Sequence, residues 1–242
     1  MKERDMIFNS EMVRAILDGR KTQTRRLMTP QPTPDDFVCP YDGPRGGHIW
    51  PSKNHQYALH VEKMLQNGDG GWEGLASDAC HFGEVGDRIW VREAFRVMGC
   101  ATDVARLMYK ASERNSFTES TRTVPVASCT KQPSHKWTPS IHMPRWASRL
   151  TLEITDVRVE RLKEISEADA RAEGIERIEN NYGNGPAYRD YLLRDARDTA
   201  EWFSHANRSF LSLWHSIYGG ESLAANPWVW VIEFKRVDGG TA

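Results

Sequence analysis

The sequence predicts an α+β fold in which a mixed β-barrel carries helices at its mouth. Three observations favour it: long β-type segments outnumber helical ones, many turn signals separate the segments, and strands and helices do not alternate as in a βαβ protein. Of the 242 residues, 39% are hydrophobic and 9 are Trp, so the chain can form an aromatic-rich core. One large domain accommodates this length.

The N-terminal segment predicts a short strand followed by a helix. The apolar string MIFN, at 6–9, indicates the strand, and apolar residues with helical spacing follow between 12 and 17. Ser10 is the expected N-cap, and Gly19 stands where the helix should stop. From about 30 to 83 the chain then turns to Pro, Gly, Asp and His with few periodic apolar runs, which predicts a long insertion without regular structure.

Three later segments predict the main strands, and two predict helices. RIWVREAF follows a Gly-Asp turn, residues 148–162 alternate as a long half-buried strand does, and the nearly continuous apolar run WVWVIEFKRV is expected to be central in a sheet. A short helix with Ser166 as N-cap and Gly174 as stop places Glu173 in its last turn, where a carboxylate opposes the helix dipole. Helical patterning over 187–218 predicts one or two more helices.

Composition excludes several classes of protein. The 32 Lys and Arg residues balance 33 Asp and Glu residues at a net charge of −1, so a polyanion would have to meet a local basic patch. The sequence shows no apolar run near the ~18 residues of a membrane helix and no signal-peptide core, which predicts a cytoplasmic protein without membrane partners. The four cysteines lack C-x-x-C spacing and are expected as free thiols, with no metal or other cofactor.

The most unusual string is GRKTQTRR, which puts four cations and two hydroxyls directly after a helix stop. Lys21 could act as a base on the hydroxyl of Thr24 if burial or a second cation lowers the pKa of the lysine. Arg20, Arg25 or Arg26 could supply that cation. A solvated charged loop is the alternative interpretation.

Two further groups are candidate binding residues. Glu93 follows the strand RIWV and would place a carboxylate near the barrel mouth, or else simply end a surface strand. The segment HMPRWASR brings Arg145, Trp146 and Arg149 together, and a ring with neighbouring cations suits an unstacked base and its phosphate. Alternatively, Trp146 packs on the barrel and the arginines are solvated.

Four segments together resemble the ASCH family of PUA-like β-barrels. In chain order they are ILDGRKTQTRR, GDRIWVRE, RLTLEITDVRVERLKEISEADARAEGI and WVWVIEFKRV. The first contains the G-x-K-x-x-T-x-R signature as Gly19, Lys21, Thr24 and Arg26. Over its full length the chain looks like the longer ASCH proteins of bacterial prophages and phages. This resemblance implies one domain over residues 1–242. Relative to the small bacterial members, the inserts lie at about 27–82, 94–147 and 176–226.

The resemblance also implies a chemistry. Small bacterial members that hydrolyse N4-acetylcytidine use a Lys, a Thr and a Glu that match Lys21, Thr24 and Glu173. The implied roles are Lys21 as base, Thr24 as nucleophile on the acetyl carbonyl, and Glu173 as proton donor or as orienter of the leaving amine.

Three functions stay open on the sequence alone, all with RNA or a modified nucleoside as partner. The matching triad favours hydrolysis of the exocyclic amide of an N-acylated pyrimidine nucleoside. The family's association with RNA and the HMPRWASR segment favour a non-catalytic reader of RNA or modified bases. An RNA-cleaving ASCH protein would use Lys21 as an electrostatic stabiliser, but no His pair stands out for acid-base work. The candidate binding residues are Arg20, Arg26, Glu93, Arg145, Trp146 and Arg149.

Overall fold

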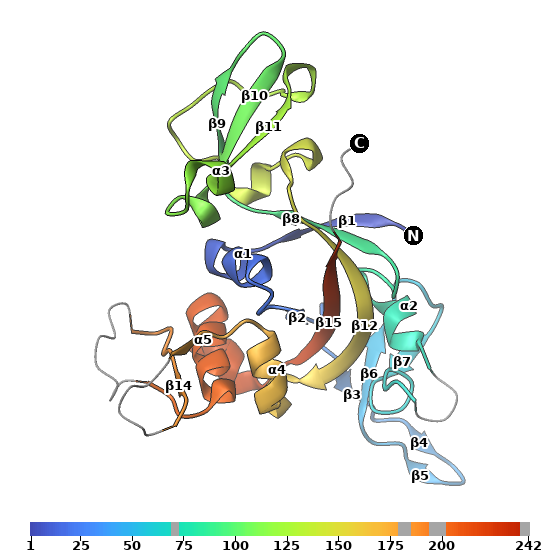
Figure 1. Cartoon of the computed structure of the whole chain (residues 1–242). Coiled ribbons are helices and arrows are strands. Elements are labelled where there is room, and N and C mark those ends of the chain that lie inside the picture. Colours follow the sequence, from blue (N-terminus) through green and yellow to red (C-terminus); the bar gives the residue numbers. More distant parts are fainter. Residues whose placement is uncertain (69–72, 179–184, 194–201, 238–242) are drawn as a thin grey trace. The chain divides into compact units, whose positions relative to one another are not determined.

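The computed structural model describes residues 1–68, 73–178, 185–193 and 202–237 as an α+β protein made mostly of strands (Figure 1). The chain divides into two compact units. Unit 1 comprises residues 1–19, 86–153 and 235–242, and unit 2 comprises residues 20–85 and 154–234. The boundary falls inside two long strands, so each unit includes part of both.

Unit 1 is built from β1 (Glu3–Ile7), α1 (Ser10–Leu17), β8 (Arg88–Arg92), β9 (Phe95–Cys100), β10 (Val104–Tyr109), α3 (Phe117–Ser120), β11 (Thr121–Pro125) and the start of β12 (Thr151–Arg161). Strand β8 pairs parallel with β1 and antiparallel with the first residues of β12. Strands β9, β10 and β11 form a separate antiparallel sheet. The strand expected from RIWVREAF is confirmed for its first five residues as β8, and the strand expected from 148–162 is confirmed as β12.

Helix α1 begins one residue earlier than its sequence suggests. The side chain of Asn9 accepts a hydrogen bond from the backbone nitrogen of Met12 at 2.8 Å, so Asn9 is the N-cap and Ser10 is the first helical residue. Both residue types cap helices well, and the position of the bonded N–H decides between them. The stop at Gly19 is confirmed, because its φ of +73° lies in the left-handed region that glycine favours.

Unit 2 holds the remaining elements. They are β2 (Gln23–Leu27), β3 (Thr33–Pro34), β4 (Val38–Cys39), β5 (Gly43–Pro44), β6 (His48–Pro51), β7 (Ala58–His60), α2 (Leu75–Ala79), the rest of β12, α4 (Glu167–Ala172), β13 (Arg177–Ile178), β14 (Ala187–Tyr188), α5 (Ala206–Ala225) and most of β15 (Trp228–Val237). Strand β15 lies between β12 and β2, so the expectation of a central strand is confirmed.

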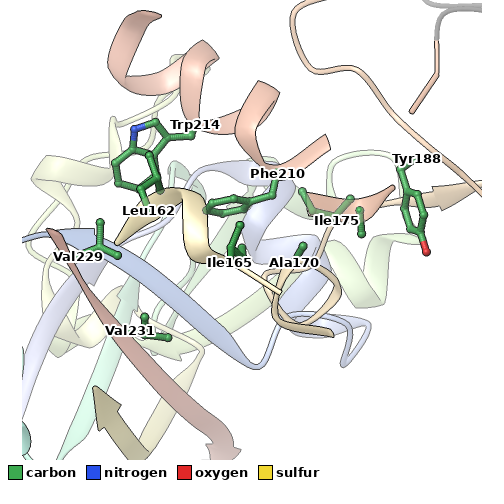
Figure 2. Close-up of a cluster of buried hydrophobic side chains, with 10 residues drawn as sticks. Leu162, Ile165, Ala170, Ile175, Tyr188, Phe210, Trp214, Val229 and Val231 are labelled. Carbon is green, nitrogen blue, oxygen red and sulfur yellow. The ribbon is translucent and has the colours of Figure 1, made fainter. Parts of the chain in front are cut away.

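Helices α4 and α5 pack on each other and on a buried apolar cluster beside β15 (Figure 2). The cluster contains Leu162, Ile165, Ala170, Ile175, Tyr188, Ala206, Phe210, Trp214, Val229 and Val231. Helical structure within 187–218 is confirmed only from Ala206 onward. Residues 187–188 form β14 instead, and residues 194–201 lie outside the described part of the chain.

The prediction that residues from about 30 to 83 lack regular structure is wrong, because part of this stretch forms strands. Strands β3, β6 and β7 form a small sheet there. Trp50 is buried with its ring edge-on to Trp230, with centroids 5.4 Å apart, and Leu59 and Leu65 are fully buried. Strands of two to four residues are too short to show a hydrophobic period, so the sequence pattern does not reveal them.

A glycine in this stretch allows a close approach that a side chain would prevent. Gly47 has a φ of +79°, and a Cβ there would lie 2.7 Å from the His60 ring and 2.9 Å from the Glu62 carboxylate. Gly43 has the same φ but nothing within 4 Å. Backbone strain of about 1–2 kcal/mol should therefore accompany either alanine, and only Gly47→Ala should add a steric cost.

We expect Gly47→Ala to lower the free energy of unfolding clearly more than Gly43→Ala does, as measured by urea denaturation. Equal losses would show that the packing of His60 and Glu62 against Gly47 is not tight.

Candidate functional site

The candidate site lies in unit 2, where the segment after Gly19 meets the C-terminal end of α4. Lys21 forms an isolated antiparallel bridge with Glu173, and the nitrogen of Thr22 donates to the Ala172 carbonyl at 2.8 Å. On the other side, the nitrogen of Phe234 in β15 donates to the Thr22 carbonyl at 2.8 Å. These backbone bonds fix Lys21 beside the helix end.

Helix α4 places Glu173 at its C-terminal end, as the sequence predicts. The Ser166 hydroxyl accepts from the backbone nitrogen of Asp169 at 3.0 Å, which confirms Ser166 as the N-cap. Gly174 has a φ of +87°, so the helix stops there and Glu173 is its C-cap residue.

Lys21 and Glu173 form a buried ion pair. The Lys21 Nζ donates to Glu173 Oε2 at 2.7 Å and to the Glu173 carbonyl at 2.9 Å, and both side chains are almost completely buried. The ammonium therefore offsets both the carboxylate and the negative end of the helix. This explains how a glutamate is tolerated at a helix C-terminus.

The surroundings of Lys21 act on its pKa in opposite directions. Burial lowers the pKa of Lys21, Glu173 opposes that effect by its charge and hydrogen bond, and Arg26 and Arg25 lower the pKa further. Two of the three arginines considered in the sequence thus act on the lysine. The third, Arg20, donates to the carbonyl of Gly174 at 2.9 Å from an exposed position.

A series of charges of alternating sign continues from this pair. We call Lys21, Glu173, Arg25, Glu160 and Arg158 the charge chain. Arg25 donates from Nη1 to Glu173 Oε1 at 3.3 Å and from Nη2 to Glu160 Oε2 at 2.8 Å. Arg158 then donates from Nε to Glu160 Oε1 at 2.6 Å. Both oxygens of the Glu173 carboxylate therefore face a cation.

Strand geometry explains why these residues meet. Successive side chains of a strand point to opposite faces, so Gln23 and Arg25 share one face of β2. In β12, Val157 is buried on one face of the strand, and Arg158 and Glu160 lie on the opposite, partly exposed face. Arg158 and Glu160 are not among the residues that the sequence predicts for the site. The only signal for them is that both are polar residues on the less buried face of the predicted strand.

Thr24 and Arg26 share the other face of β2. Thr24 is buried, and Arg26 is hydrogen-bonded to Tyr218. Burial lowers the pKa of Arg26, and the charge of Glu173 opposes this. The Tyr218 ring contacts that of Trp214, with centroids 4.3 Å apart and planes tilted by 33°, next to the non-helical Gly219 in α5. Tyr218 is thus a site residue that the helical pattern alone did not reveal.

Glu93 forms a separate buried pair in unit 1. Its carboxylate accepts two bonds from Arg149, from Nε at 2.8 Å and from Nη2 at 3.1 Å. The guanidinium also donates to Ser112 at 3.0 Å and lies over the Tyr109 ring at 4.1 Å. Burial raises the pKa of Glu93, and Arg149 opposes this.

The other two candidate residues of the segment HMPRWASR, Arg145 and Trp146, have different surroundings from Arg149. Arg145 donates to both oxygens of Glu3, at 2.8 and 2.9 Å, on the exposed surface. Trp146 packs against a buried apolar cluster formed mainly by side chains of β9, β10 and β11. Its ring is edge-on to that of Phe95, with centroids 6.2 Å apart. The charges of Arg145 and Arg149 are therefore each offset by a glutamate of their own.

These two arginines give a matched test of burial. We expect Arg149→Met to lower the free energy of unfolding by about 3 kcal/mol and Arg145→Met by less than about 1 kcal/mol. The reason is that the Glu93 side chain is 2% exposed and the Glu3 side chain 39%. Without Arg149, Glu93 would be buried without its cation.

The Arg149→Met loss should also depend on pH. The substitution removes the charge that opposes burial, so the pKa of folded Glu93 rises further above the ordinary value of 4.5. The penalty is then fully present at neutral pH, decreases as pH falls below the raised pKa of the folded state, and is gone below the ordinary value, where the carboxyl is protonated in both states. Urea denaturation at pH 7 and at low pH measures this, and a loss independent of pH would contradict it.

Comparisons with known proteins returned no match among family models, curated proteins or solved structures. Within the described ranges, no helix is both long and apolar enough to cross a membrane. The same residues contain no group of three or more His, Cys, Asp or Glu side chains arranged to hold a metal ion.

Proposed function

We propose that this protein is a PUA-like ASCH protein that hydrolyses the exocyclic amide of an N-acylated pyrimidine nucleoside, free or in RNA. One observation carries the proposal: Lys21 and Glu173, which are 152 positions apart, form a buried ion pair at 2.7 Å. They come from two of the segments that resemble the family. The four free cysteines support a cytoplasmic location.

In the proposed reaction, the Thr24 hydroxyl attacks the acyl carbon while neutral Lys21 takes its proton. The C–N bond breaks, the proton passes from Lys21 to the leaving amine, and the acyl group remains on Thr24 as an ester. Water then attacks the ester and Lys21 accepts a proton from it. As the ester C–O bond breaks, Lys21 returns this proton to the Thr24 oxygen, and the carboxylic acid leaves. Burial supports the role of Lys21, because it lowers the pKa of the lysine.

The resemblance implies that Glu173 donates a proton or orients the leaving amine, whereas its contacts support a different role, the orientation of Lys21. A proton donor must carry a proton, whereas both oxygens of Glu173 accept hydrogen bonds from cations, at 2.7 Å from Lys21 and at 3.3 Å from Arg25. Glu173 therefore holds Lys21, and the proton for the leaving amine comes from Lys21.

Substrate would enter beside Tyr218. Lys21 and Thr24 are buried, whereas Tyr218 is exposed and hydrogen-bonded to Arg26. Arg26 acts on the pKa of Lys21, so it lies near the pair. A planar base stacked on Tyr218 would bring its acyl group toward Thr24.

The second candidate is a reader that binds RNA or a modified base without turnover. The observation that favours it is the burial of Lys21 and Thr24, since a site that only binds needs no freely accessible nucleophile.

The test is incubation with a panel of N-acylated pyrimidine nucleosides, with release of the free amine followed by chromatography and mass spectrometry. Hydrolysis of N4-acetylcytidine or a related amide supports the proposal, and the unmodified nucleosides serve as blanks. If no member of the panel is hydrolysed but one binds in a calorimetric titration, the reader replaces the enzyme.

A further inference from the structure

We propose that Arg25 is a positioning residue, which fixes the Glu173 carboxylate against Lys21 and is itself held by Glu160 and Arg158. The catalytic consequence rests on the proposed function. The coupling along the charge chain rests only on the fold of unit 2.

The charge chain leads from the interior toward the surface. The Arg25 side chain is 0% exposed, whereas Glu160 is 22% and Arg158 is 23% exposed. A buried guanidinium is costly unless carboxylates surround it. Arg25 meets this need by bridging Glu173 at 3.3 Å and Glu160 at 2.8 Å. Arg158 then fixes Glu160 at 2.6 Å.

Arg25 and Lys21 share one carboxylate, with one oxygen each. Burial is the main cause that lowers the pKa of Lys21, and the positive charge of Arg25 lowers it further, which favours the neutral amine that a base requires. Glu160 offsets the charge of Arg25, and Arg158 offsets the charge of Glu160. Removing Glu160 should therefore ease proton loss from Lys21, and removing Arg158 should make it harder.

Other charged groups also face the pair or the outer end of the chain. Arg26 from β2 acts on Lys21 directly and is bonded to Tyr218 of α5. Asp169 of α4 lies 3.6 Å from Arg25 and 3.0 Å from Arg158, and Glu233 of β15 is paired with Arg158. Asp156 of β12 also lies 3.5 Å from Arg158. None of these groups is altered in the variants below.

The first measurement needs no substrate. Lysine labelled with 13C and 15N is titrated by NMR, and the Lys21 signal is assigned by its loss in Lys21→Met. Glu160→Gln is expected to shift the midpoint of this signal to lower pH, and Arg158→Gln to higher pH. Both changes are at partly exposed positions, which favours folded variants. Glu3→Gln removes a carboxylate that is paired with Arg145 and that does not act on the pKa of Lys21, so it should leave the midpoint unchanged.

The second measurement uses turnover. Arg25→Lys keeps the positive charge but loses the fork that spans two carboxylates. It is expected to lower kcat by about 10²-fold, because a misplacement of about 1 Å in a reacting group can cost that much. The acid limb of the pH profile should move with Glu160→Gln and Arg158→Gln in the same directions as the Lys21 signal.

Shifts of the same sign in the two variants, or shifts no larger than that of Glu3→Gln, would overturn the proposal. An Arg25→Lys protein with unchanged kcat would do the same. A wild-type protein without turnover would overturn the proposed function instead, while the Lys21 signal would still decide whether the charge chain acts on the lysine.

Discussion

Lys21→Met is expected to abolish amide hydrolysis while the protein remains folded. A Thr hydroxyl has too high a pKa to attack an amide unaided, so loss of its base should reduce kcat by at least about 10²-fold. Methionine fills the space of the buried lysine, and Arg25 remains to face Glu173. The acid limb of the wild-type pH profile should reflect proton loss from Lys21, with turnover rising as pH rises.

Thr24→Ala should give a loss similar to that of Lys21→Met, and the double variant should lose no more than either single one. Nucleophile and base act as a unit, so their effects do not add. Lys136→Met, at an exposed lysine, is the control for removal of a charge. Circular dichroism and thermal unfolding verify the fold, and turnover that survives both substitutions would place the chemistry elsewhere.

The largest expected effect on stability is that of Trp50→Ala. Trp50 is buried edge-on against Trp230, and its indole nitrogen donates to the Pro30 carbonyl at 2.8 Å. Truncating such a residue typically costs about 3–5 kcal/mol. That is a large share of the roughly 5–15 kcal/mol by which a domain is usually stable.

Tyr41→Ala is the matched control in the same stretch, because Tyr41 is 94% exposed. Its change in the free energy of unfolding should be within about 0.5 kcal/mol. Urea denaturation of both variants measures the difference. A small loss for Trp50→Ala would mean that residues 30–83 do not contribute to the core of unit 2.

The long strands and the short helix α4 could be predicted because their signals are local. Residues 148–162 alternate over many positions, and β12 occupies 151–161 of them. In α4, Ser166 and Gly174 mark both ends through their own backbone preferences. The strands within 30–83 could not be predicted, because two to four residues carry no period and gain their stability from contacts such as Trp50 with Trp230.

The candidate site divides in the same way. Lys21, Thr24 and Glu173 stand out by the residue types and spacing that resemble the ASCH family. Arg25 and Glu160 do not, because a charged residue on a strand is usually solvated. Their contact joins positions 135 apart, and only the packing of the elements in unit 2 makes it.

The caps of α4, the alternation of β12 and the apolar run of β15 follow from the sequence alone, because they depend on neighbouring residues and on elementary backbone geometry. Tertiary structure alone decided that Lys21 loses contact with water, that Glu173 is shared with Arg25, and that Glu93 is paired with Arg149. Burial and charge pairing depend on which distant segments meet, and strand register sets those meetings. The electrostatics of the site therefore belong to the folded chain rather than to any segment of it.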